Sequence, residues 1–231
     1  MKAQKLYINN IPAIVWGKAS PKVYLYVHGK MSCKENAENF ARIAENKGWQ
    51  TISFDLPEHG ERKNENYPCN IWNGIHDLTE ISNYVFVNWK QVSLYACSLG
   101  AYFSLHAYGS RHFENCLFQS PIVDMEYLIH QMFNWFNITE KELKAKKEIL
   151  TPIDVLSWDY YQYVKVHPIT LWDSNTRILY GEKDTMQSLS VIEQFARSYH
   201  CLLTISENSE HPFMSPEDIA VAERWLTDNI I

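Results

Sequence analysis

Short apolar runs alternate with amphipathic segments along most of this chain, and this alternation limits the possible fold more than any other feature of the sequence. The runs are rich in β-branched and aromatic residues, as expected of buried strands, and the segments between them have apolar residues at helical spacing. The strand-like runs lie at 23–29, 51–57, 92–97, 114–121, 177–181 and 201–206, and the helical segments at 34–47, 71–89, 99–109, 187–198 and from 215 onward.

Strands separated by helices predict an α/β fold, in which right-handed crossovers join the strands of a mostly parallel sheet with helices on both faces. The 231 residues contain no repeat and no Pro- or Ser-rich linker, so we expect a single domain over residues 1–231. In such sheets the ligand lies beyond the carboxyl ends of the strands. Functional residues should therefore follow strands directly.

Two segments depart from the alternation. Near the N-terminus two short apolar runs flank Asn9-Asn10, which predicts a hairpin, and Pro12 in the second run indicates an edge strand. Residues 122–170 contain two aromatic-rich stretches around a charged helical one. We interpret 122–170 as a helical insertion that forms a cap or lid over the strand ends, with a pair of ordinary crossover helices as the alternative.

The charge, the lengths of the apolar runs and the cysteine spacing argue against nucleic acid, a membrane or a metal ion as a partner. The 21 basic and 27 acidic residues give a net charge of −6, so no excess of positive charge favours nucleic acid or an anionic membrane as a partner. No apolar run is long enough to predict a signal peptide or a membrane-spanning helix. The five cysteines are scattered without metal-type spacing, which predicts reduced thiols, a cytoplasmic location and no metal site.

The strongest functional pattern is A-C-S-L-G at 96–100, between an apolar strand and an apolar helix. A serine hydroxyl is a poor nucleophile unless it is exposed beside a base, and a sharp strand-to-helix turn provides that exposure. Such a turn requires small residues two positions before and after the nucleophile. Ala96 and Gly100 meet this requirement around Ser98, whereas Cys97 would have bulky residues at both positions. Ser98 is therefore the candidate nucleophile.

This strand–turn–helix pattern resembles the nucleophile elbow of the α/β-hydrolase family, although Ala96 stands where the family most often has glycine. The resemblance covers nearly the whole chain apart from 122–170. It implies a three-layer α/β-hydrolase fold with a helical cap. It also implies an oxyanion hole formed by the backbone N–H groups of Leu99 and of Lys30, which follows His28-Gly29 at the end of an earlier predicted strand.

Two further residues complete a catalytic triad in the chain order that this family shows, serine, acid and then histidine. Asp184 follows a predicted strand in the sequence G-E-K-D and resembles the family's acid, with Asp124 and Glu182 as alternatives. Of nine histidines, His211 alone lies both after the acid and beyond a strand end. The stretch D-L-P-E-H-G at 55–60 resembles a family loop motif, and we expect its role to be structural.

The expected activity is hydrolysis of a small to medium carboxylic ester through an acyl-enzyme on Ser98, and a triad of this kind needs no cofactor. The alternatives are a thioesterase, a non-catalytic binding protein, or an aminopeptidase or amidase with Glu126 and Asp159 as candidate ligands for an amine. The oligomeric state is not predicted. Six aromatic residues of the insertion either line an acyl pocket or pack the insertion onto the sheet: Phe133, Trp135, Phe136, Trp158, Tyr160 and Tyr161.

Overall fold

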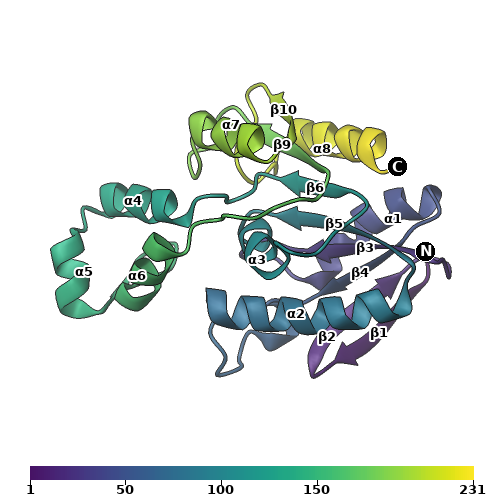
Figure 1. Ribbon diagram of the computed structural model, residues 1–231, viewed down its shortest axis with the longest axis horizontal. Helices are drawn as coiled ribbons and strands as arrows, with labels where there is room; N and C mark the ends of the chain where they lie inside the picture. The colour runs from purple at the N-terminus through teal and green to yellow at the C-terminus, as the bar shows by residue number, and fades with distance from the viewer.

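The computed structural model describes all 231 residues, and its centre is one eight-stranded sheet with helices on both faces (Figure 1). The spatial order of the strands is β1-β2-β4-β3-β5-β6-β9-β10, and β2 alone runs antiparallel to its neighbours. The predicted α/β class is confirmed. The strands of this sheet are β1 (Ala3–Ile8), β2 (Ile11–Trp16), β3 (Lys22–Val27), β4 (Gln50–Phe54), β5 (Gln91–Cys97), β6 (Cys116–Gln119), β9 (Thr176–Gly181) and β10 (Leu202–Ser206).

Both faces of the central strands are buried, which explains why their sequences are continuous apolar runs. On β3, Leu25 faces one part of the hydrophobic core and the neighbouring Tyr24 faces the other. The face that includes Leu25 is covered by α2 (Ile71–Asn88), α3 (Leu99–Ala107) and α7 (Leu189–Ser198). The opposite face is covered by η1 (Lys34–Ala37), α1 (Glu38–Asn46) and α8 (Pro216–Asn229).

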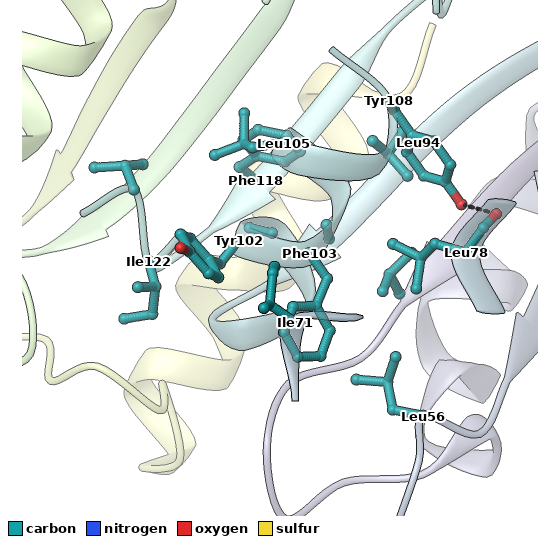
Figure 2. Packing of buried hydrophobic residues seen from close by; sticks show 14 of the residues in the cluster. Leu56, Ile71, Leu78, Leu94, Tyr102, Phe103, Leu105, Tyr108, Phe118 and Ile122 are labelled. Atoms are coloured by element: carbon teal, nitrogen blue, oxygen red, sulfur yellow. Dashed lines mark hydrogen bonds between the residues drawn. The ribbon is translucent and has the colours of Figure 1, made fainter. Parts of the chain in front are cut away.

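The helices α2 and α3 pack closely against each other because a glycine lies at their contact. A Cβ on Gly74 would lie 2.6 Å from the ring of Phe103, so no larger residue fits there without a shift. At the end of α3, the hydroxyl of Tyr108 donates a 2.8 Å hydrogen bond to the carbonyl oxygen of Leu78 (Figure 2). These contacts hold α3, and with it the turn that precedes α3, against the rest of the core.

The N-terminal hairpin forms as predicted, but the position predicted for Pro12 is wrong. Asn9 and Asn10 have φ values of 45° and 69°, the left-handed pair that a two-residue hairpin turn requires. Pro12 lies on β2, which pairs with both β1 and β4, so the edge strand is β1. The proline is tolerated because the pairing with β4 begins only at Ala13, one residue further along.

Residues 122–170 form a separate group of elements between β6 and β9, which are neighbours in the sheet. In Figure 1 the three helices of this segment lie together at one end of the molecule. The segment also contains a small antiparallel hairpin, which the aromatic and charged pattern did not predict. Its elements are α4 (Met125–Phe136), α5 (Glu140–Lys146), β7 (Glu148–Leu150), β8 (Val155–Ser157) and α6 (Trp158–Val166).

No helix of the chain combines the length and the apolar character needed to cross a lipid bilayer.

Candidate active site

Ser98 lies at the turn between β5 and α3 in a backbone conformation that few non-glycine residues adopt. Its φ of 50° and ψ of −119° turn the chain sharply from strand to helix. Gly100 packs against the end of β3, where a Cβ would lie 2.3 Å from the carbonyl oxygen of His28. The small residue expected two positions after the nucleophile is therefore required by the close approach of β3 to this turn.

The imidazole of His211 lies between the hydroxyl of Ser98 and the carboxylate of Asp184. Ser98 Oγ is 2.8 Å from His211 Nε2, and His211 Nδ1 is 2.7 Å from Asp184 Oδ2. A carboxylate accepts a proton and does not donate one, so this contact assigns the ring proton to Nδ1 and leaves Nε2 free to accept from the serine hydroxyl. The loops after β5, β9 and β10 thus bring three distant residues into one hydrogen-bonded row.

The loop after β9 holds the carboxylate of Asp184 in a fixed orientation. Its second oxygen, Oδ1, accepts hydrogen bonds from the backbone N–H groups of Met186 at 2.8 Å and Gln187 at 3.3 Å. The side chain is 1% exposed, and that of His211 is 12% exposed. The contact between this acid and the imidazole is therefore shielded from solvent, which strengthens it.

The two alternative acids have other partners. Asp124 caps the N-terminus of α4 by accepting from the backbone N–H of Tyr127 at 2.9 Å. Glu182 accepts from the backbone N–H of Asn208 at 3.2 Å. Neither carboxylate contacts His211.

The alternative nucleophile, Cys97, is poorly suited to the role. Burial raises the pKa of its thiol to about 12. Because the thiolate is the reactive form of cysteine, this thiol is unreactive at neutral pH.

Two backbone N–H groups, from residues that line the same cavity as Ser98, have no acceptor in the protein. Leu99 is the first residue of α3, so its N–H has no partner within the helix. Lys30 follows the end of β3, and its N–H makes no hydrogen bond to the chain. Both residues border the cavity that contains Ser98. Unpaired N–H donors of this kind are what a negatively charged oxygen next to a serine requires.

Two histidines hold the loop that carries Lys30, a role that we did not predict from the sequence. His28 Nδ1 donates to the carbonyl oxygen of Gly29 at 2.7 Å, while His28 Nε2 accepts from the backbone N–H of Leu56 at 3.1 Å. Because the N–H and C=O of a trans peptide point in opposite directions, fixing the Gly29 carbonyl also fixes the direction of the Lys30 N–H. His59 Nε2 accepts from the next N–H, that of Met31, at 3.1 Å.

These roles require neutral imidazoles with an unprotonated nitrogen. Burial lowers the pKa of His28 to about 4, so the ring stays neutral over the ordinary pH range. A histidine directly before a glycine at the end of a strand is the sequence signal from which this anchor could have been predicted.

The stretch 55–60 supports the same loop, in agreement with the structural role expected from the sequence. The carboxylate of Asp55 is fully buried and accepts from the backbone N–H of Lys34 at 2.9 Å and from its Nζ at 2.7 Å. Gly60 has a φ of +53°, and a Cβ there would lie 2.2 Å from the Asp55 carboxylate. Glu58 also has a positive φ, 62°, at the position where the resembling motif has glycine.

A cavity of about 360 Å³ opens directly above the Ser98 hydroxyl. Fifteen of its 22 lining residues are apolar, and they come from the sheet loops and from residues 122–170. The charged groups at its edge are Lys30 and Asp154, whose side chains form an ion pair between the loop after β3 and the hairpin of the insertion. No cluster of three or more His, Cys, Asp or Glu side chains is arranged to bind a metal ion.

Solved structures with the same arrangement of sheet and helices identify the fold. Est1E from Butyrivibrio proteoclasticus with ferulic acid bound superimposes with a TM-score of 0.74 at 13% identity, over 98% of this chain and 97% of that one. The α/β-hydrolase domain-containing protein 10 from mouse superimposes with a TM-score of 0.77 at 16% identity, over 99% of this chain and 98% of that one. This chain has the α/β-hydrolase fold. A further α/β-hydrolase structure, the esterase Pf2001 from Pyrococcus furiosus, gives a TM-score of 0.65 at 16% identity over 100% and 93%.

The likeness to these α/β-hydrolases is one of three-dimensional structure. No protein-family model and no curated protein matches the sequence.

In this α/β-hydrolase fold, residues 122–170 supply much of the cavity wall, but mostly not through the aromatic residues that we considered. Trp135 and Tyr160 line the cavity. Phe133 and Tyr161 are buried against each other, with ring centroids 5.4 Å apart, and Trp158 packs on Tyr161 at 6.0 Å. Three of the six aromatic side chains, Phe133, Trp158 and Tyr161, therefore pack against one another within residues 122–170, whereas the packing alternative expected contacts with the sheet.

Proposed function

We propose that this chain is a serine hydrolase that cleaves small to medium carboxylic esters through an acyl-enzyme. The single observation that carries the proposal is the row of two short hydrogen bonds from Ser98 through His211 to Asp184, placed at the floor of a mostly apolar cavity. A hydroxyl, an imidazole and a carboxylate in this order are the groups that nucleophilic acyl transfer needs.

In the proposed mechanism, Ser98 Oγ attacks the ester carbonyl carbon while His211 Nε2 takes the hydroxyl proton. The carbonyl oxygen becomes an oxyanion that accepts from the N–H groups of Lys30 and Leu99. Collapse of this intermediate expels the alcohol, which receives the proton from His211. A water molecule then attacks the acyl-enzyme with His211 as its base, and the carboxylic acid and the free serine are released.

The cavity favours an ester over the amine-bearing substrates of an aminopeptidase. Such an enzyme would need an acidic group near the serine to hold the substrate ammonium. Neither Glu126 nor Asp159 lines the cavity, and the one carboxylate that does, Asp154, is paired with Lys30. The esterase names of Est1E and Pf2001 agree with this choice. A thioester remains the second substrate class, and a cytoplasmic location remains a prediction from the cysteine pattern.

Replacement of the nucleophile tests the proposal. Ser98→Ala should lower kcat/KM for a p-nitrophenyl ester by at least about 10⁴-fold, because the covalent step is lost while the fold is kept. The variant should also fail to react with a fluorophosphonate probe. Ser110→Ala, at an exposed position after α3, is the matched control and should behave as the unchanged protein. A Ser98→Ala variant that keeps most of the activity would exclude Ser98 as the nucleophile.

A further inference from the structure

Methionine is concentrated around the proposed catalytic serine. Four of the six methionines of the chain line the cavity above Ser98, and they come from three different parts of the fold: Met31, Met125, Met132 and Met186. Met125 and Met132 lie on α4 and are 7% and 5% exposed, so they form a buried wall. Methionine has an unbranched and polarizable side chain that changes rotamer easily, and it therefore suits ligands of variable shape.

Apart from the hydroxyl of Tyr160, the polar side chains at the cavity wall are either paired with other groups or uncharged, and they offer little to a polar acyl group. Lys30 and Asp154 pair with each other, and Ser157 Oγ accepts from the backbone N–H of Tyr160 at the start of α6. The thiol of Cys69 is neutral, because burial raises its pKa to about 12. The hydroxyl of Tyr160 has no partner, but it is itself shielded from solvent. An acyl group with a charge or several hydroxyls would lose its hydration here without compensation.

The apolar wall continues out of the cavity onto the surface. Met31 is 93% exposed at the mouth, and Ile153 and Val155 of the β7–β8 hairpin, which also line the cavity, are 39% and 46% exposed. Leu150, which pairs with Val155 across this hairpin, is 81% exposed. Apolar side chains exposed beside a ligand site provide a surface on which an apolar part of the ligand can continue.

We propose that the cavity binds the acyl part of its substrate as a flexible aliphatic chain, which runs from Ser98 along the methionine wall to the exposed β7–β8 hairpin. The inference rests on the proposed esterase function and specifies its substrate class. Acetyl would leave the methionine wall uncovered, whereas a medium-length chain would cover it. Since burial of one methylene contributes about 0.8 kcal/mol, each added methylene should raise kcat/KM by up to about four-fold until the chain reaches the mouth.

The test is a series of p-nitrophenyl esters with a constant leaving group: acetate, butyrate, hexanoate, octanoate and decanoate. We expect kcat/KM to rise by about 100-fold from acetate to octanoate, which corresponds to full burial of about three to four of the six added methylenes. Ile153→Ser places a polar group at the mouth and should lower the ratio of decanoate to butyrate turnover, and Met132→Gln should lower the ratio of octanoate to acetate turnover. Val166→Ser replaces an exposed apolar residue of α6 outside the cavity and should leave both ratios unchanged.

Labelling with a fluorophosphonate, followed by identification of the modified residue, tests the esterase proposal separately from the aliphatic assignment. A protein that is labelled at Ser98 but prefers acetate, or shows no dependence on chain length, would overturn the aliphatic assignment and leave the esterase proposal standing. Preference for a hydroxycinnamate ester that disappears in Tyr160→Phe would overturn it in favour of a phenolic acyl group. Absence of both labelling and ester hydrolysis in a folded protein would overturn both proposals.

Discussion

At the scale of single residues, the two oxygens of the Asp184 carboxylate have separate tasks. Oδ2 contacts the His211 ring, while Oδ1 accepts from the backbone of its own loop. An oxygen that is held by the backbone cannot rotate away, so the other oxygen stays directed at the imidazole. Asp124 uses its carboxylate only to cap a helix, a task that asparagine performs equally well.

Asparagine substitutions at the two aspartates distinguish their roles. Asp184→Asn should lower kcat/KM for a p-nitrophenyl ester by about 10³–10⁴-fold, because an amide no longer selects the required tautomer of the imidazole. Asp124→Asn should keep the activity and the thermal midpoint of the unchanged protein. A larger loss of activity in Asp124→Asn than in Asp184→Asn would transfer the acid's role to residue 124.

At the scale of structural elements, the proposed oxyanion loop depends on the adjacent loop after β4 as much as on its own sequence. Lys34 and Asp55, which are 1% and 0% exposed, form the ion pair that joins these loops. Burial acts to lower the pKa of Lys34, but its hydrogen bonds to Asp55 and to the partly exposed Glu61 and Glu35 outweigh burial and raise it. The lysine is therefore charged, and its removal would leave Asp55 buried without a counter-charge.

Lys34→Met should destabilise the folded protein by about 3–5 kcal/mol, because a buried carboxylate then loses its partner. The matched control is Lys146→Met, which removes an exposed ion pair with Glu142 and should change the free energy of unfolding by less than about 0.5 kcal/mol. Urea denaturation of the three proteins measures both effects. Equal stability of Lys34→Met and the unchanged protein would show that Asp55 does not need the lysine.

The sequence predicted the elements of the sheet and the proposed catalytic residues better than it predicted the wall of the cavity. Strand ends and chain order suffice to bring Ser98, Asp184 and His211 together, because parallel strands end at one edge of the sheet. Which side of α4 or α6 faces the serine depends on how the insertion packs against the sheet. No local pattern records that packing, so Phe133 and Tyr161 were candidates for the pocket although they are buried against each other.

At the scale of the whole molecule, the buried His28 and the partly buried His106 make stability depend on pH. Burial lowers the pKa of both His28 and His106 to about 4, and His106 Nε2 also lacks a hydrogen-bond partner. In the unfolded chain these rings would take up a proton below about pH 6.5. Unfolding therefore takes up protons between about pH 6.5 and 4, so the stability that neutral rings provide above this range is lost as the pH falls through it.

The free energy of unfolding should decrease by up to about 1.4 kcal/mol per pH unit for each of these two histidines below about pH 6.5. Urea denaturation at pH 7.5, 6 and 5 measures this slope. His106→Leu removes one titrating ring. It should therefore lower the slope by up to about 1.4 kcal/mol per pH unit, which is the contribution of one proton. The same slope in both proteins would mean that His106 takes up its proton equally readily in the folded and unfolded states, contrary to its lowered pKa.

The route of the chain through residues 122–170 has an evolutionary consequence. The excursion begins at the end of β6, and the strand that follows it, β9, is the immediate neighbour of β6 in the sheet. A longer, shorter or unrelated stretch inserted at this point would leave the pairing of the eight strands as it is. Replacement of residues 122–170 alone could therefore change the substrate specificity during evolution. The residues at the strand ends would remain as they are.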